Sequence, residues 1–258
     1  MNSKKLIRKL WKMFPSKIAK QYHDYVGLMV AHLREETSSI VVCLDVTPEA
    51  IDTAIARHAD LIISHHPFLY GKRSEVLKDP YRRSLFRQLS DASIPVYSFH
   101  TNFDEGKFGM NDALAERLKL KDVRPIPDLP MGRMGELQAP TDIRDFAKEA
   151  VRLLDLDYGQ LIACGKKEIR TVGIIGGAGS RESFLALTRG CDIFLSGDTP
   201  YHVRRELRDR GYNYLHVDHE IEKIFVSQMK KILLSIDDSL KIIEVDDVTQ
   251  SELILRAE

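Results

Sequence analysis

The sequence has no long hydrophobic run and no excess of charge of either sign. No apolar stretch approaches the roughly 18 residues that a membrane-spanning helix needs, and no apolar signal-peptide region follows the basic first residues. Lysine plus arginine and aspartate plus glutamate number 38 each, so the net charge gives no support for nucleic acid as a partner. These absences predict a protein that does not enter the membrane.

Cysteine is also scarce. The three cysteines, Cys43, Cys164 and Cys191, are odd in number, far apart and next to apolar residues. This pattern predicts reduced, buried thiols and a cytoplasmic location, because a disulfide framework needs paired cysteines. With 258 residues, 43% of them hydrophobic, the chain is long enough for one large domain or two small ones.

The first twenty residues are basic and contain no acidic residue, while apolar residues recur among them at helical spacing. We predict an amphipathic helix that is interrupted near Pro15. Such a helix can lie on a membrane or on nucleic acid. Packing of its apolar stripe on the core, with the lysines in water, explains the pattern more simply, so we assign no function to it.

A βαβ unit is predicted next. Residues 39–45 are rich in β-branched side chains, Thr47 can cap a helix that begins at Pro48, and residues 59–64 form a second apolar strand. The two strands of such a unit are parallel. Further elements are predicted as a helix over 81–92, a strand over 94–99 and a helix over 111–118.

The second half of the chain repeats this pattern. Proline-rich residues 122–140 predict a connector or domain boundary. Helices are then predicted over 141–156, 181–189, 202–210 and 219–235, and strands over 171–175, 191–196, 212–217 and 240–245. Cys-Asp-Ile-Phe-Leu-Ser at 191–196 echoes Ala-Asp-Leu-Ile-Ile-Ser at 59–64. We therefore expect an α/β fold of two similar halves, residues 1–121 together with 201–258, and residues 122–200.

Chemistry-bearing residues follow the predicted strands. His65 and His66 come directly after residues 59–64, and ligands of open α/β sheets collect at the carboxyl ends of strands. Adjacent side chains on an extended backbone diverge, so the two imidazoles suit two metal ions better than one. Asp104 follows the strand over 94–99, and His219 and Glu222 share a helical face at i and i+3. Together these five predict a two-ion centre between the halves, with one carboxylate bridging.

Two other features leave alternatives open. The glycine-rich turn at 176–179 can bind an anion or can be only a tight connection. Most single histidines suggest a structural or solvated role, but His202 lies close to Asp198, so it is a candidate for contact with a ligand or substrate.

Eight motifs resemble the NIF3-like family of dinuclear-metal proteins, in places named GTP cyclohydrolase 1 type 2 homologues. They span nearly the whole chain: Asp-Tyr-Val-Gly-Leu at 24–28, Leu-Asp-Val-Thr-Pro at 44–48, Ser-His-His-Pro at 64–67, His-Thr-Asn-Phe-Asp at 100–104, Gly-Arg-Met-Gly at 132–135, Gly-Gly-Ala-Gly-Ser at 176–180, Ser-Gly-Asp at 196–198 and His-Glu-Ile-Glu-Lys at 219–223.

The resemblance implies that the metal ligands are His65, His66, Asp104, His219 and Glu222, with Glu222 bridging. Many relatives have three residues between the last histidine and the glutamate, a spacing that His216 and Glu220 would match here. We prefer His219 and Glu222, because the alternative places His216 inside a strand. His100 also matches a family position and is expected to orient a ligand or contact substrate.

The resemblance further implies two divalent ions per subunit (zinc, iron, manganese or cobalt) and a ring-like homohexamer. We expect a metal-dependent hydrolase that acts on a nucleotide-like, cyclic amide or phosphoester substrate through an activated water held between the ions. A scaffold or regulatory protein that binds metal without turnover, and a metal-storage protein, are the alternatives.

Overall fold

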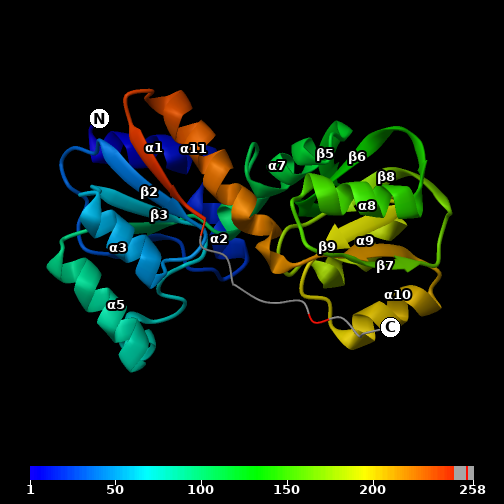
Figure 1. Ribbon diagram of the computed structural model, residues 1–258, viewed down its shortest axis with the longest axis horizontal. Helices are drawn as coiled ribbons and strands as arrows, with labels where there is room; N and C mark the ends of the chain where they lie inside the picture. Colours follow the sequence, from blue (N-terminus) through cyan, green and yellow to red (C-terminus); the bar gives the residue numbers. More distant parts are fainter. Residues whose placement is uncertain (247–253, 255–258) are drawn as a thin grey trace.

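Two β-sheets lie side by side, one in each half of the molecule (Figure 1). The structure is a computed structural model that describes residues 1–246 and 254. The first sheet has the order β1-β4-β3-β2-β11, with β1 Gly27–Val30, β2 Ser39–Cys43, β3 Leu61–Ser64, β4 Val96–Ser98 and β11 Lys241–Val245. The second has the order β5-β6-β8-β9-β10-β7, with β5 Lys121–Ile126, β6 Leu129–Asp142, β7 Gln160–Ala163, β8 Glu168–Ile174, β9 Ile193–Ser196 and β10 Asn213–His216.

The first sheet is parallel from β4 to β11, and only β1 at its edge runs antiparallel. The predicted βαβ unit is confirmed: α3 (Pro48–Ala56) connects β2 to β3, and the Thr47 side chain accepts a hydrogen bond from the Ala50 amide. Alternate residues of the buried strands enter different cores. Ile40 and Val42 face one core, while Val41 faces the other.

Helices cover both faces of this sheet, which explains why the three central strands β2, β3 and β4 are buried along their whole length (Figure 1). On one face lie α3 and α5 (Pro80–Asp91), preceded by the short α4 (Arg73–Val76). The other is covered by α1 (Ser3–Met13) and α11 (Ile224–Ile236). As predicted, the N-terminal helix breaks at Pro15, after which α2 (Ser16–Gln21) begins, and Leu6 and Leu10 bury its apolar stripe.

The second half contains a matching βαβ unit, in which β8 and β9 are parallel and α9 (Ser183–Thr188) connects them after a 3-10 turn, η1 (Ser180–Glu182). In each unit, the aspartate just before the second strand accepts hydrogen bonds from two consecutive backbone amides. Asp60 Oδ2 accepts the amides of Ser38 and Ser39 at 2.9 and 3.0 Å. Asp192 Oδ2 accepts the amides of Arg170 and Thr171 at the same distances. The sequence echo therefore reflects a repeated structure.

Of the two alternatives predicted for residues 122–140, the connector is wrong, whereas a boundary does fall there, because β5 is the first strand of the chain that belongs to the second sheet. These residues form the antiparallel hairpin β5–β6, and β6 pairs in turn with β8. Prolines such as Pro125 are tolerated here because β5 is the edge strand, where one row of backbone amides needs no partner. Elsewhere in this half, α8 (Ile143–Leu153) and α10 (Tyr201–Asp209) form where helices were predicted.

Two further expectations differ from the structure. β10 belongs to the second sheet, so the second half extends to residue 216 and not to 200, and 201–216 do not join the first half. The Cys164 thiol is exposed, although Cys43 and Cys191 are buried as predicted. Sequence reasoning also missed β1, β7 and α4.

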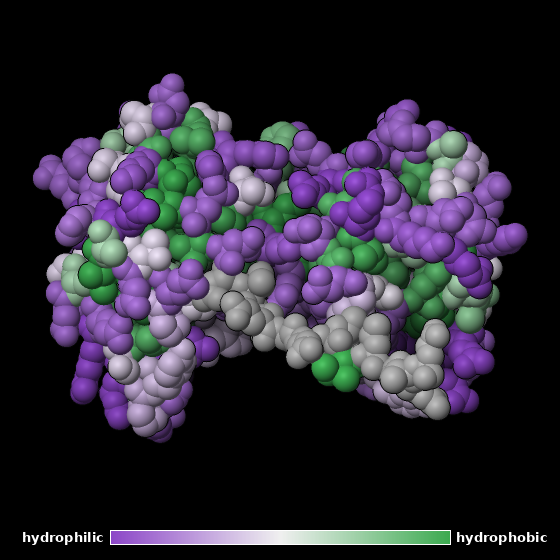
Figure 2. Space-filling view, in the orientation of Figure 1, coloured by the Kyte–Doolittle hydropathy of each residue, from purple (hydrophilic) through white to green (hydrophobic). Residues whose placement is uncertain are grey.

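The chain returns from β10 to the first half through η2 (His219–Lys223) and α11, which runs from the junction onto the first sheet (Figure 1). The carboxyl ends of the parallel strands of both sheets face this junction. Within residues 1–246, no helix has the length and apolarity needed to cross a bilayer. Hydrophilic side chains cover most of the face in Figure 2.

Candidate metal centre

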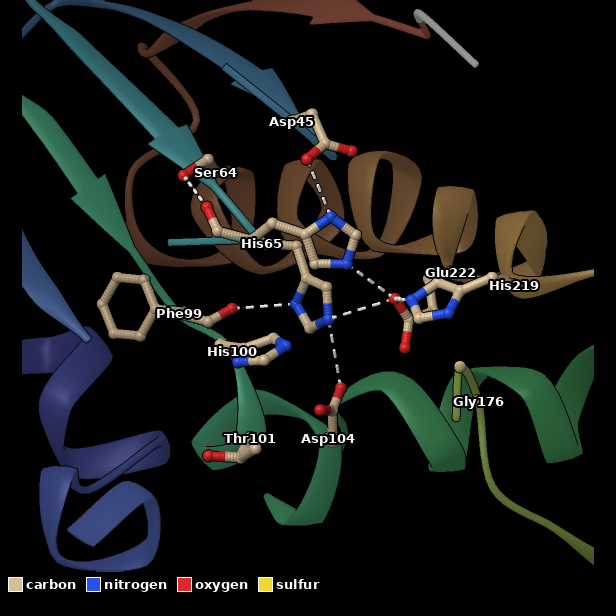
Figure 3. Close-up of polar contacts among 12 residues, drawn as sticks. Asp45, Ser64, His65, Phe99, His100, Thr101, Asp104, Gly176, His219 and Glu222 are labelled. Carbon is tan, nitrogen blue, oxygen red and sulfur yellow. Dashed lines mark hydrogen bonds and ion pairs between the residues drawn. The ribbon is translucent and has the colours of Figure 1, made fainter. Parts of the chain in front are cut away.

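The five predicted ligands meet at the junction between the two halves (Figure 3). His65 and His66 follow β3, and Asp104 lies in α6 (Thr101–Glu105), a short helix just after β4. His219 and Glu222 lie in η2, just after β10 of the other sheet. Asp104 is therefore on a helix and not at a strand end, but the centre lies between the halves as expected.

Glu222 is the central residue of the cluster. Its carboxylate is 4% exposed, and Oε2 lies 2.9 Å from His66 Nε2, 2.9 Å from His219 Nε2 and 3.6 Å from His65 Nε2. One carboxylate oxygen thus faces three imidazoles that come from both halves. In a 3-10 helix the side chains at i and i+3 eclipse each other, and this explains how His219 and Glu222 reach the same point.

His65 and Asp104 contribute two buried atoms without hydrogen bonds. Within the described residues, neither His65 Nε2 nor Asp104 Oδ1 has a hydrogen-bond partner, although the two atoms are 3.4 Å apart. Burying an unsatisfied polar atom costs about 1–3 kcal/mol, so such atoms need a reason. A cation between the imidazole and the carboxylates would satisfy both, and the donor set fits a divalent transition metal.

Each of the three imidazoles is oriented by a bond at its other nitrogen. His65 Nδ1 lies 2.9 Å from the Phe99 carbonyl oxygen, and His66 Nδ1 lies 2.9 Å from Asp45 Oδ1. His219 Nδ1 lies 2.7 Å from Asp198 Oδ2. When Nδ1–H donates to these oxygens, the Nε2 lone pair is left for a metal ion.

Asp45 and Asp198 were not predicted to orient these histidines. A signal was present in the sequence, because each carboxylate follows a strand at the same edge of its sheet as the ligands. What the sequence could not provide was the pairing of each carboxylate with a histidine on a different element.

The charges within the cluster shift the pKa values of its members in opposite directions. Burial lowers the pKa of His65 well below its usual value. Burial and the nearby Glu222 carboxylate both raise the pKa of Asp104 well above its usual value. Burial opposes protonation of His66, but hydrogen bonds to Asp45 and Glu222 raise its pKa to about 10. The hydrogen bond to Glu222 outweighs burial at His219 and raises its pKa to about 9.

Glycines let the backbone approach this centre. A Cβ atom on Gly177, where φ is +62°, would lie 2.1 Å from Glu222 Oε1, and one on Gly197 would lie 2.8 Å from the Gly177 carbonyl oxygen. The turn after β8 therefore packs against Glu222. This contact gives the glycine-rich turn a structural role at the centre itself.

Asn111, the second residue of α7 (Met110–Arg117), connects the two halves beneath the centre. Its fully buried amide donates to the carbonyl oxygens of Asp104 at 3.2 Å and Met131 at 3.0 Å. Its oxygen accepts the amide of Gly176 at 2.7 Å. Asn111 thus fixes the helix that carries Asp104 relative to the glycine-rich turn that contacts Glu222.

Of the three other candidate histidines, His100 lies at the centre, whereas His202 and His216 do not. His100 lies at the centre, with its ring 5.0 Å from that of His65, and its Nδ1 is 2.8 Å from Asp24 Oδ2. His202 is exposed on α10 and belongs to no group of potential ligands within the described residues. His216, the alternative to His219, instead lies 2.9 Å from Thr199 Oγ1 through its Nδ1.

The ligand atoms fall into groups that could each hold a metal ion. His66, His219 and Glu222 form one group, and His65, Asp104 and Glu222 form another. Glu222 is common to both. A third group consists of His65, His66 and His100.

This fold and site define a two-sheet α/β protein with a buried histidine and carboxylate centre that could bind metal. The chain belongs to the DUF34/NIF3 family (NGG1p interacting factor 3), whose sequence profile matches residues 1–250. Similar proteins named GTP cyclohydrolase 1 type 2 homolog occur in Clostridium acetobutylicum, with 31% identity over 78% of this chain and 77% of the relative. A relative of the same name in Clostridium perfringens has 32% identity over 78% of this chain and 79% of its own length.

The fold is shared with solved structures of related proteins. A Bacillus cereus protein related to NIF3 superposes with a TM-score of 0.88 and 20% identity, over 99% of both chains. The predicted family and the α/β, NIF3-like fold are thereby confirmed.

Proposed function

We propose that the protein binds two divalent metal ions and uses them as a hydrolase. One ion would be held by His65, Asp104 and Glu222, and the other by His66, His219 and Glu222, so that the Glu222 carboxylate bridges them. The observation that carries the proposal is a pair of buried atoms, His65 Nε2 and Asp104 Oδ1, that have no hydrogen bond in the described part of the chain and lie beside the shared Glu222 carboxylate.

Divalent ions in such a pair lower the pKa of water and polarise a carbonyl or phosphoryl oxygen. The protein itself would supply orientation: Asp45, Asp198 and the Phe99 carbonyl hold the three imidazoles with Nε2 toward the centre. Asp24 holds His100 in the same way, 2.8 Å from Nδ1, which leaves His100 Nε2 for a ligand or substrate.

A nucleotide-like, cyclic amide or phosphoester compound is the proposed substrate class. Relatives with 31–32% identity carry the name GTP cyclohydrolase 1 type 2 homolog, which gives a purine nucleotide as the first compound to test. The donor set of imidazoles and carboxylates suits zinc, iron, manganese or cobalt better than calcium. A cytoplasmic homohexamer is part of the same proposal and is tested by light scattering on the purified protein.

The test combines metal analysis with turnover. Purified protein is expected to hold two equivalents of a divalent transition metal, and Glu222→Gln to lose most of both, since it contributes to both groups. Asp104→Ala should lose one equivalent. Nucleotides, phosphoesters and cyclic amides are then screened with and without chelator. Wild-type metal content in Asp104→Ala and Glu222→Gln would refute the ligand assignment, and metal without turnover of any class would favour a scaffold role.

A further inference from the structure

A cavity of about 480 Å³ lies beside the first sheet, and one of its lining residues, Asp24, contacts His100 of the candidate metal centre. It is lined by residues of α2, β1, the segment between them, the loop that follows β3 and the start of α4, among them Lys20, Asp24, Tyr25, Gly71 and Arg73. Its volume is within the range of about 300–1,000 Å³ that small-molecule sites occupy. Asp24 connects the cavity to the centre, because it also holds His100.

A row of aromatic rings runs from the centre to this cavity. The His66 and His100 rings are 5.6 Å apart, the His100 and Tyr70 rings 6.3 Å, and the Tyr70 and Tyr25 rings 5.9 Å. Tyr70 is 65% exposed and Tyr25 is 43% exposed. Tyr25 lines the cavity, and the Tyr70 ring beside it is tilted by 57°, so a planar ring can stack on one of the two exposed tyrosines and meet the other at an angle.

The cavity also has two cationic side chains that form no ion pair with the described residues. Lys20 and Arg73 are exposed, and within residues 1–246 no ion pair includes either of them. The Arg73 guanidinium lies over the Phe86 ring at 4.3 Å, which holds it in place. Asp24 is the one carboxylate of the lining, and its Oδ2 is engaged by His100 and by the amide and hydroxyl of Thr101.

We propose that this cavity binds a planar ring compound with an anionic group, such as a nucleoside monophosphate, with its ring against Tyr25 and Tyr70 and its anionic group near Lys20 and Arg73. The assignment rests on the proposed function to the extent that such a ligand is the substrate of the metal centre. Arginine and lysine bind phosphate through charge-assisted hydrogen bonds, and a stacked base adds affinity with little sequence preference.

Binding of guanosine 5′-monophosphate to the full-length protein by calorimetry tests the proposal. Guanosine, which lacks the anion, and ribose 5-phosphate, which lacks the ring, should both bind more weakly than the nucleotide. Tyr70→Ala should weaken nucleotide binding about tenfold, while Tyr70→Phe keeps it. Arg73→Gln should weaken it by a similar factor and reduce its dependence on salt.

Matched controls are Tyr81→Ala and Arg82→Ala, exposed residues of α5 outside the cavity, which should bind like wild type. Metal content is measured for every variant. Nucleotide binding that needs Tyr70 and Arg73 but persists without metal or turnover supports the cavity even if the hydrolase proposal fails. The cavity assignment is overturned if the nucleotide binds no better than both fragments, or if Tyr70→Ala and Arg73→Gln match their controls while Glu222→Gln abolishes binding.

Discussion

His65 Nε2 lies 3.4 Å from Asp104 Oδ1, with both atoms buried and neither hydrogen-bonded within the described residues. The fold thus brings a nitrogen lone pair and a carboxylate oxygen to one point, a pairing that only a proton or a cation stabilises. A substitution of Asp104 is therefore expected to change stability in opposite directions with and without metal.

Asp104→Asn should stabilise the metal-free protein and destabilise the metal-loaded one. Without metal, the new amide can donate to His65 Nε2 and needs no proton, whereas burial and Glu222 raise the pKa of Asp104 and make its ionised form costly, so we expect a gain of about 1–3 kcal/mol. With metal, the variant loses a ligand and therefore the stabilisation that binding confers on the wild type. Thermal unfolding with chelator and with added metal measures both effects. A variant less stable than wild type under both conditions would contradict this explanation.

Asp45→Asn and Asp198→Asn should each weaken metal binding about 10- to 100-fold without changing the number of ions bound at saturation. Each carboxylate orients one histidine through Nδ1, and neither belongs to the groups of potential ligands. Competition against a metal-sensitive dye gives the affinities. Asp52→Asn, at an exposed position of α3, is the control and should bind metal like wild type.

Asn111→Asp should lower both stability and metal affinity, whereas Asn213→Asp should lower stability alone. Both are buried, and both side chains donate to two carbonyl oxygens and accept the amide of a glycine. Each change leaves carbonyl oxygens unsatisfied, at a cost of about 2–3 kcal/mol. Only Asn111 contacts Asp104 and Gly176. Equal loss of metal affinity in both variants would show that general destabilisation is the cause.

Gly177→Ala should abolish binding of the ions that Glu222 holds, because its Cβ would lie 2.1 Å from Glu222 Oε1. Gly190→Ala is the matched control: φ there is +97°, yet nothing lies within 4 Å of the added Cβ. The control should lose about 1–2 kcal/mol from backbone strain and keep its metal. Comparing the metal content of the two variants separates the steric clash with Glu222 from the effect of backbone strain. Full metal content in Gly177→Ala would show that Glu222 can move aside.

Asp60→Asn should destabilise the protein at pH 7, and this effect should shrink as the pH falls through the folded pKa of Asp60. Burial opposes ionisation of Asp60, but the backbone amides of Ser38 and Ser39 outweigh it, so its pKa is lowered in the folded state. A lowered folded pKa contributes stability above the unfolded value of about 3.9, and this contribution is lost as pH falls through the folded pKa. Urea unfolding at several pH values measures the difference.

Asp192→Asn should show the same pH dependence, because the amides of Arg170 and Thr171, together with Lys166, lower the pKa of Asp192 in the same way. Asp52→Asn is again the control. If the destabilisation by Asp60→Asn stays constant from pH 7 to pH 2, ionisation of the carboxylate is not its cause.

Sequence patterns were sufficient where a structure is local. The βαβ units follow from β-branched runs, the Thr47 cap and Pro48, and the break of the first helix follows from Pro15. The hairpin over 121–142 was missed because its prolines predict a connector unless the strand is known to lie at an edge, which is a property of the assembled sheet.

For the candidate site too, the sequence predicted the ligand residues but not the contacts that orient them. The five residues that meet at the junction could be named in advance from their ligand chemistry, from their positions after predicted strands or at a predicted helix start, and from the family resemblance. The bonds that orient them could not, since Phe99 contributes a backbone oxygen and Asn111 contacts three separate segments. Such pairings depend on how elements pack, and a single sequence carries no record of that.

The return of the chain from β10 to the first sheet has a consequence for biosynthesis. Strand β11 pairs with β2, and α11 covers the face beside it, so the first sheet cannot be completed until residues 241–245 have left the ribosome. His219 and Glu222 arrive in the same late segment. His65, His66 and Asp104 are therefore synthesised more than 100 residues before His219 and Glu222, and the proposed two-ion centre can assemble only after both groups have been translated.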